Sequence, residues 1–151
     1  MNIKPVFMLL LLFLVSNVTF AAKNELKWTQ VLQPQYFPGK VIQDGSNMIR
    51  LKSPVRAEDP ALVPVKVTAN IKQTKERYIK RLLLLIDNNP VPFVGEFEFT
   101  PESGKADIAM RVRVNSYSYI RAIAEMNNGD LYMVKNYVKA SGGCSAPVGA
   151  D

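Results

Sequence analysis

Apolar and polar residues alternate along much of the second half of the chain. From Val63 to Ile71 every second residue is apolar and the residues between are polar or proline, which is the period of a strand with one buried face. The same period recurs over residues 93–100 and 106–114, with a turn over 101–105 between them. These three segments therefore predict three strands.

A continuous apolar run has a different meaning. Residues 78–87 contain the run Leu82 to Ile86 and end at the turn sequence Asp87-Asn88-Asn89-Pro90. The run is short for a helix, so it predicts a buried central strand, with a helix as the alternative.

The clearest turn lies near the end of the chain. Residues 119–126 and 131–139 flank Asn127-Asn128-Gly129-Asp130, where the glycine can adopt a positive φ, so a β-hairpin is predicted. Five or more strands joined by short turns, with no amphipathic helix between them, favour an all-β fold. We expect an antiparallel β-sandwich of immunoglobulin-like type.

The first 21 residues predict a secretory signal peptide. Lys4 precedes an apolar run from Val6 to Val15, and Thr19 and Ala21 suit a signal peptidase site. The run is too short for a membrane span of roughly 20 residues, so we expect cleavage before Ala22 or one residue later, with anchoring as the alternative. The prediction is an exported, periplasmic protein that has no membrane contact after cleavage.

Residues 22–56 are predicted to form a peripheral N-terminal segment, because proline and glycine break them into short pieces. Short strands over 40–43 and 47–51 are expected there, and Trp28 is expected to pack rather than to bind a ligand. Residues 57–140 then form the sandwich, and residues 141–151 a flexible C-terminal arm.

The composition excludes most kinds of catalytic site. The chain has no histidine and one cysteine, which removes histidine bases, catalytic triads, most transition-metal sites and tetrathiolate sites. We expect no metal, no cofactor and no catalysis by the chain alone. The carboxylates stand singly or at predicted turns, where turn chemistry is the simpler explanation: Glu58, Asp59, Asp87, Asp107 and Asp130.

The charge balance is moderately basic, with 19 lysines and arginines against 13 acidic residues. Such an excess favours anionic ligands or acidic partners without requiring them, and no nucleic-acid partner is expected for an exported protein. The simpler interpretation of the basic residues is a solvated face: Lys72, Lys75, Arg77, Lys80, Arg81, Arg111 and Arg113.

The one cysteine, Cys144, follows Gly142 and Gly143 in a tail without an apolar pattern that would bury it. Paired glycines add no packing, so they suggest a backbone that bends or enters a narrow space beside the thiol. Four residues beyond Ala140, the thiol can reach about 13 Å from the domain. A lone thiol in an oxidising compartment is normally a liability, which favours covalent loading of this cysteine as its function.

Three other interpretations of Cys144 stay open: a cloning remnant, a disulfide partner beyond Asp151, and a neutral surface cysteine. The thiolate is the nucleophilic form, and Lys139 is the nearest positive charge in the sequence. No general base accompanies the thiol, so a second protein has to supply activation and redox chemistry. This points to a carrier rather than to an enzyme.

Taken together, these features resemble SoxY, the sulfur-carrying subunit of the periplasmic thiosulfate-oxidising Sox system. The specific match is Gly142-Gly143-Cys144 after a β-domain. Supporting matches are Glu58-Asp59-Pro60 with Val63-Pro64-Val65, the Asp87 to Pro90 turn, and the strand from Ala109 to Val114.

The resemblance implies an immunoglobulin-like fold and a SoxZ-like partner, either a separate chain or fused within a longer protein. It implies that a haem enzyme joins Cys144 oxidatively to thiosulfate, that a hydrolase then releases sulfate, and that Gly142 and Gly143 let the arm enter both enzymes. Residues 145–147 replace the glycines that ordinarily follow the cysteine. With these residues the tail resembles more closely that of the fused SoxYZ-like carriers associated with quinoprotein dehydrogenases.

Two functions of different classes therefore compete. The first is a periplasmic carrier with sulfur intermediates on Cys144, and the second is a non-catalytic accessory module of a periplasmic quinoprotein dehydrogenase. A self-sufficient thiol enzyme is a distant third, because no base is evident.

Overall fold

The computed structural model describes residues 22–140, so the predicted signal peptide (1–21) and the predicted arm (141–151) lie outside the described residues. The chain divides into two compact units, Met1–Gly39 and Lys40–Asp151, and each is described by itself. Among the described residues, no helix is both long and apolar enough to cross a bilayer.

The described part of the first unit is helical. Residues 22–27 are α-helical, followed by the π-helix η1 (Trp28–Leu32) and the short α-helix α2 (Gln33–Tyr36). The pattern of prolines did not predict this helix, but Pro34 lies in the first turn of α2, where its missing N–H costs nothing. Trp28 packs as expected, with its ring centroid 6.3 Å from that of Phe37.

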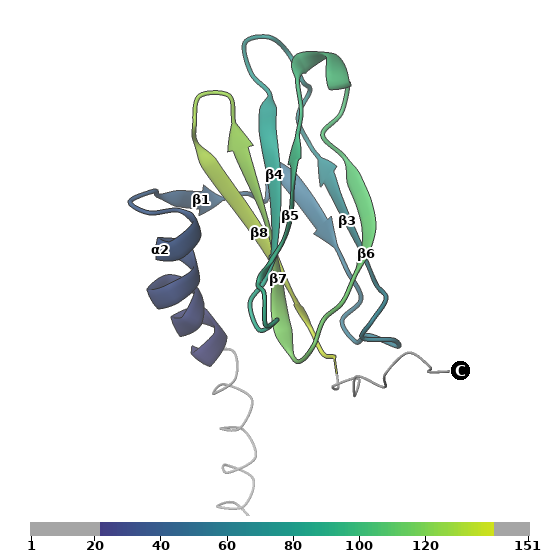
Figure 1. Ribbon diagram of the computed structural model, residues 1–151. Coiled ribbons are helices and arrows are strands. Elements are labelled where there is room, and N and C mark those ends of the chain that lie inside the picture. Colours follow the sequence, from purple (N-terminus) through teal and green to yellow (C-terminus); the bar gives the residue numbers. More distant parts are fainter. Residues whose placement is uncertain (1–21, 141–151) are drawn as a thin grey trace, which may run out of the picture. The chain divides into compact units, whose positions relative to one another are not determined.

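The second unit contains two sheets (Figure 1), which confirms the immunoglobulin-like β-sandwich. The five-stranded sheet has the order β1-β8-β7-β4-β5 and the three-stranded sheet the order β2-β3-β6. The strands are β1 (Ile42–Asp44), β2 (Ile49–Lys52), β3 (Val63–Ala69), β4 (Ile79–Ile86), β5 (Phe93–Glu98), β6 (Ile108–Val112), β7 (Ser118–Met126) and β8 (Leu131–Val138).

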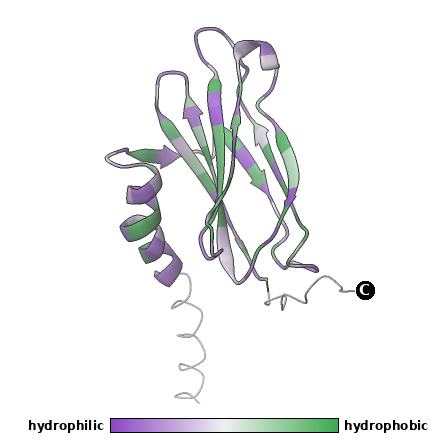
Figure 2. Ribbon diagram, in the orientation of Figure 1, coloured by the Kyte–Doolittle hydropathy of each residue, from purple (hydrophilic) through white to green (hydrophobic). Residues whose placement is uncertain are grey.

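The core forms where the apolar faces of the two sheets meet. Figure 2 shows hydrophobic and hydrophilic residues interleaved along the strands. Val63, Val65 and Val67 of β3 are buried, while Pro64 and Lys66 between them are exposed. Each fully buried apolar side chain of this size contributes about 1.5–3 kcal/mol. Burial of the apolar residues that the alternation places on one face therefore drives the formation of this sheet.

Strand β4 lies between β7 and β5 in the five-stranded sheet, so the helix alternative for residues 78–87 was wrong. Leu82 and Leu84 belong to the core between the sheets. Leu83 and Leu85 point to the other face of the sheet and are also buried. Burial on both faces explains why this strand has a continuous apolar run instead of an alternation.

The hairpin between β7 and β8 is confirmed. Gly129 has φ +88°, and the Met126 N–H donates to the carbonyl of Asp130 at 2.9 Å across the turn. Eight residue pairs, from Ser118–Val138 to Glu125–Leu131, hold the two strands in register. The hairpin thereby delivers the end of β8 to one end of the sandwich.

Strands β1 and β2 both belong to the sheets, so the sandwich begins earlier in the chain than the predicted boundary at residue 57. β1 pairs in parallel with β8, an exception among otherwise antiparallel strand pairs. Gly45, which follows β1, is required because a Cβ there would lie 2.9 Å from the Met133 backbone. Three residues of strand leave too short a pattern for the sequence to show this pairing.

One predicted turn residue has another role. The carboxylate of Asp87 accepts hydrogen bonds from Nε of Arg121 at 2.9 Å and from its Nη2 at 2.8 Å, and both side chains are 0 % exposed. The Arg121 guanidinium also lies 5.2 Å from the Tyr119 ring centroid. Asp87 lies in the predicted turn after β4, and its carboxylate has a structural role that turn chemistry did not predict, because its partner Arg121 is 34 residues away in the sequence.

We expect Asp87→Ala to lower the free energy of unfolding by about 3–5 kcal/mol, because it leaves the Arg121 charge buried without this carboxylate. Urea denaturation measures the change. The matched control is Asp130→Ala in the exposed hairpin turn, for which we expect a loss below about 1 kcal/mol. Equal losses for both variants would contradict a stabilising role for the buried pair.

Candidate functional site: the root of the C-terminal arm

The three residues predicted to form the site, Cys144, Gly142 and Gly143, lie outside the described residues. The described chain ends at Ala140, just after β8. We call Lys139 and Ala140 the arm root, because the predicted arm continues from them. The structure therefore places the point from which the arm leaves the sandwich.

Hydrogen bonds attach the end of β8 to residues 51–57, which comprise the end of β2 in the other sheet and the segment after it. Nδ2 of Asn136 donates to the carbonyl of Leu51 at 3.0 Å and to Oγ of Ser53 at 3.2 Å. The Lys139 N–H donates to the carbonyl of Val55 at 2.8 Å, and the Lys139 carbonyl accepts from the Ala57 N–H at 3.1 Å. We call this set of hydrogen bonds the root clamp.

Burial completes the attachment. Val138 is 0 % exposed and Ala140 is 1 % exposed, and both belong to the core between the sheets. Lys139 between them is exposed, so the alternation of β8 continues through the arm root. Hydrogen bonds of the Lys139 backbone and burial of the Val138 and Ala140 side chains therefore hold the chain in place up to the last described residue.

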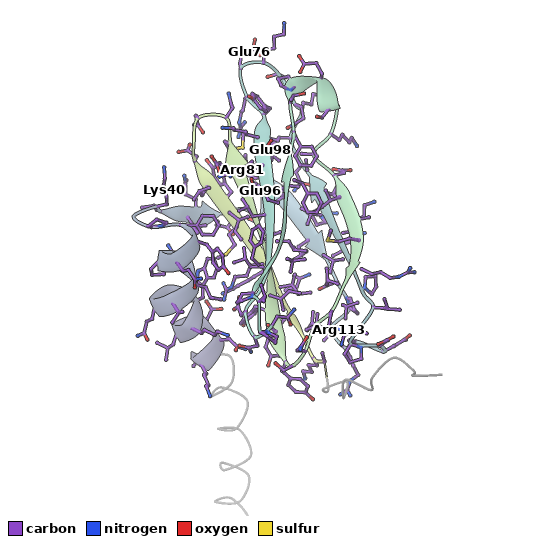
Figure 3. All side chains as sticks on the ribbon, viewed as in Figure 1. Lys40, Glu76, Arg81, Glu96, Glu98 and Arg113 are labelled. Atoms are coloured by element: carbon purple, nitrogen blue, oxygen red, sulfur yellow. The ribbon has the colours of Figure 1, made fainter. Side chains whose placement is uncertain are left out.

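The root clamp also brings two cations together. Arg56 is the bridge partner of Lys139 in a parallel pairing, and both side chains are exposed. Arg113 lies at the same end of the sandwich (Figure 3). Glu58, which is also exposed, follows Arg56 after one residue. Positive charge near a cysteine favours its thiolate, which is the reactive form.

Neither tyrosine nor histidine supplies a general base near the arm root. Burial raises the pKa of Tyr137, and repulsion from Tyr119 and Tyr117 raises it further, so this phenol stays protonated at neutral pH. The chain has no histidine. Within residues 22–140, no group of three or more cysteine and carboxylate side chains is placed to hold a metal ion. The described residues therefore place two exposed cations, Arg56 and Lys139, where the predicted arm begins.

Other charged residues that the sequence analysis named lie away from the arm root or serve a turn. Arg81 bonds Glu96 at 2.9 Å and also pairs with Glu125, and Figure 3 shows Arg81, Glu96 and Glu98 together, away from Arg113. The hydrogen bond to Glu125 is the main cause of the raised pKa of Arg81. Asp59 serves turn chemistry as predicted, because its carboxylate accepts from the Ala61 N–H at 2.8 Å.

Arg56 is the residue of this region that the sequence did not single out. It is far from Lys139 in the chain, and only the pairing of residues 55–57 with the end of β8 brings the two together. No motif marks such a contact, because it depends on where the two sheets meet.

Comparison with known proteins gives one family. Residues 34–144 match the family model described as sulfur oxidation protein SoxY. The match runs from α2 through both sheets and ends at the cysteine. No curated protein matches the chain in sequence.

Solved structures show the same fold. The sulfur carrier protein SoxY from Chlorobium limicola f thiosulfatophilum superposes with a TM-score of 0.61 and 24% identity, covering 82% of this chain and 97% of that one. A superoxide reductase (neelaredoxin) from Ignicoccus hospitalis gives a TM-score of 0.55 and 15% identity, covering 62% of this chain and 80% of that one. Proteins with different functions share this sandwich, so the fold alone assigns none.

We expect Arg56→Gln with Lys139→Gln to slow the reaction of Cys144 with anionic iodoacetate more than with neutral iodoacetamide. The rate constant for iodoacetate divided by that for iodoacetamide should fall by about twofold, because the variant loses two positive charges, screened by salt, at the base of the predicted arm. Alkylation quenched at a series of times and followed by mass spectrometry measures both rates.

The control for this experiment is Lys72→Gln with Lys105→Gln, which has the same net charge but changes exposed lysines in the β3–β4 and β5–β6 connections. An equal fall of the ratio in the control would show that only the total charge of the protein matters.

Proposed function

This chain belongs to the SoxY family of sulfur carriers, which are not enzymes, and from this we propose that it holds its sulfur cargo covalently on Cys144. The observation that carries the proposal is the extent of the family match. It spans residues 34–144 and so ends at the only thiol of the chain. The root clamp supports it, because it fixes the point from which this thiol extends.

Loading is an oxidation. The Cys144 thiolate forms an S–S bond with the outer sulfur of thiosulfate, giving a cysteine S-thiosulfonate, and two electrons pass to a haem enzyme. The thiol proton goes to solvent. Because the chain has no histidine, and Tyr137 near the arm root stays protonated, the oxidant and the base come from the partner enzyme.

Unloading is a hydrolysis. Water attacks the terminal sulfur of the thiosulfonate, the S–S bond to that sulfur breaks, and sulfate leaves. The electron pair of the broken bond stays on the carrier as a cysteine persulfide, and two protons are released to solvent. A hydrolase supplies this step, and Gly142 and Gly143 allow the arm to enter its active site.

Membership in the SoxY family implies partnering with SoxZ and with sulfur-oxidation enzymes. We propose that the SoxZ-like partner is a separate chain or a domain of a longer protein, and that the carrier works in the periplasm. The localisation rests on the predicted signal peptide of residues 1–21. The haem enzyme and the hydrolase are then periplasmic as well.

The residues after the cysteine favour one subtype. Ser145, Ala146 and Pro147 stand where further glycines ordinarily follow in Sox carriers. We propose that the chain is nearest to the Y-type half of the SoxYZ-like carriers associated with quinoprotein dehydrogenases. We propose a sulfur intermediate derived from thiosulfate or similar to it as the cargo, and thiosulfate itself is the first compound to test.

We expect protein purified from the periplasm without reductant to carry the mass of added sulfur or of a thiosulfonate group. Reductant should remove the addition, because a thiol displaces the cargo from the cysteine sulfur. Intact mass spectrometry before and after reduction measures this, and Cys144→Ser should show no addition.

The control is Ser141→Cys in the Cys144→Ser background, which keeps one thiol on the tail but moves it next to the arm root. A cargo on this relocated thiol would mean that any exposed thiol is modified. An unmodified Cys144, or only a disulfide to another protein, would contradict the carrier and favour an accessory module of a quinoprotein dehydrogenase.

A further inference from the structure

The two sheets differ in charge. The three strands of the smaller sheet carry four basic residues and no acidic residue: Arg50, Lys52, Lys66 and Arg111. The strands of the larger sheet carry four basic residues, Lys80, Arg81, Arg121 and Lys135, and four acidic ones, Asp44, Glu96, Glu98 and Glu125. The positive charge is thus concentrated on one sheet and balanced on the other.

All four cations lie on the outer face of the smaller sheet. They are exposed, and they alternate with buried residues such as Leu51 and Val65 that face the core. We call this surface the cationic face. None of the four forms an ion pair with another residue in the range 22–140.

The register places these charges close together. Lys52 of β2 pairs directly with Lys66 of β3, and Lys66 pairs with Ala109, two residues before Arg111 of β6. Directly opposite residues on one face have Cβ atoms roughly 5 Å apart, and diagonal neighbours are roughly 7–8 Å apart. Like charges directly opposite each other destabilise a sheet, so an anion that binds here relieves a repulsion already present in the fold.

A shallow hollow lies within the cationic face. Its volume is about 620 Å³, and it is lined by the cations Lys52, Lys66 and Arg111 together with the exposed apolar residues Pro64 and Ala109. An apolar patch with arginine beside it is a common composition of protein–protein interfaces, in which arginine is enriched and lysine is not.

We propose that the cationic face docks an acidic surface of a partner protein, with one protruding side chain of the partner in the hollow. A site for one small anion requires donors that converge on a point, whereas these four cations are exposed and spread over three strands. A flat bilayer would leave the hollow unfilled. Complementary charge raises the association rate and fixes the orientation of such a complex.

The cationic face adjoins the arm root. Ser53 and Pro54 line the hollow, and Ser53 is also part of the root clamp. A partner docked here therefore lies next to the point where the chain continues toward Cys144. This link to the thiol rests on the proposed function, whereas the docking itself does not.

Fluorescent poly-L-glutamate serves as the acidic polypeptide probe, and its binding is followed by fluorescence anisotropy over a range of salt concentrations. The test variant combines Lys52→Gln, Lys66→Gln and Arg111→Gln. The control combines Lys72→Gln, Lys75→Gln and Lys105→Gln, which removes three exposed cations outside the cationic face and gives the same net charge.

We expect the test variant to bind the probe about tenfold more weakly, with a shallower salt dependence, and the control to change binding by less than about twofold. Circular dichroism and thermal unfolding verify that both variants fold. Because the changed side chains are exposed and the Lys52–Lys66 repulsion is removed, the test variant should be at least as stable as the wild type.

Equal weakening in both variants, or no binding by the wild type, would overturn the proposal. Tighter binding of phosphatidylglycerol vesicles, DNA or free thiosulfate than of poly-L-glutamate would also overturn it, in favour of that other ligand. The mass of the Cys144 adduct, measured on the same variants, separates the two proposals. An absent adduct with intact docking refutes only the carrier, and a present adduct without docking refutes only the cationic face.

Discussion

The attachment of β8 to residues 51–57 is the constraint on which the rest of the structure depends. The Asn136 side chain joins the larger sheet to Leu51 in β2 of the smaller sheet and to Ser53 just after β2. The backbone of Lys139 bonds to Val55 and Ala57. These contacts close one side of the sandwich and hold the arm root in place. The predicted arm therefore begins at a position that the sandwich holds in place.

The structure separates the tasks of a carrier between parts of the chain. The core and the buried Arg121–Asp87 pair give a stable body, and the proposed site of loading, Cys144, belongs to the tail. Arg56 and Lys139 place positive charge where the tail begins. The chemistry itself is left to partners, in agreement with a chain without histidine.

Short sequence patterns predicted the parts of the fold that depend on neighbouring residues in the chain. Period-two alternation identified β3, β5 and β6, and Gly129 identified the hairpin, because burial of one face and a positive φ leave marks in the sequence. The parallel pairing of β1, the Arg121–Asp87 pair and the proximity of Arg56 to Lys139 depend on contacts between distant segments. The N-terminal helix was missed because Pro34 is harmless in a first helical turn.

The central claim is that Cys144 takes up a sulfur cargo and gives it up again. The most direct test is a pulse of thiosulfate labelled with radioactive sulfur at its sulfonate atom, the atom that leaves as sulfate, followed by an unlabelled chase, in periplasmic extract containing the protein. The account predicts that the label appears on the peptide containing Cys144 and then leaves it during the chase. A label that never attaches to this peptide, or that attaches and stays through the chase, would contradict a carrier.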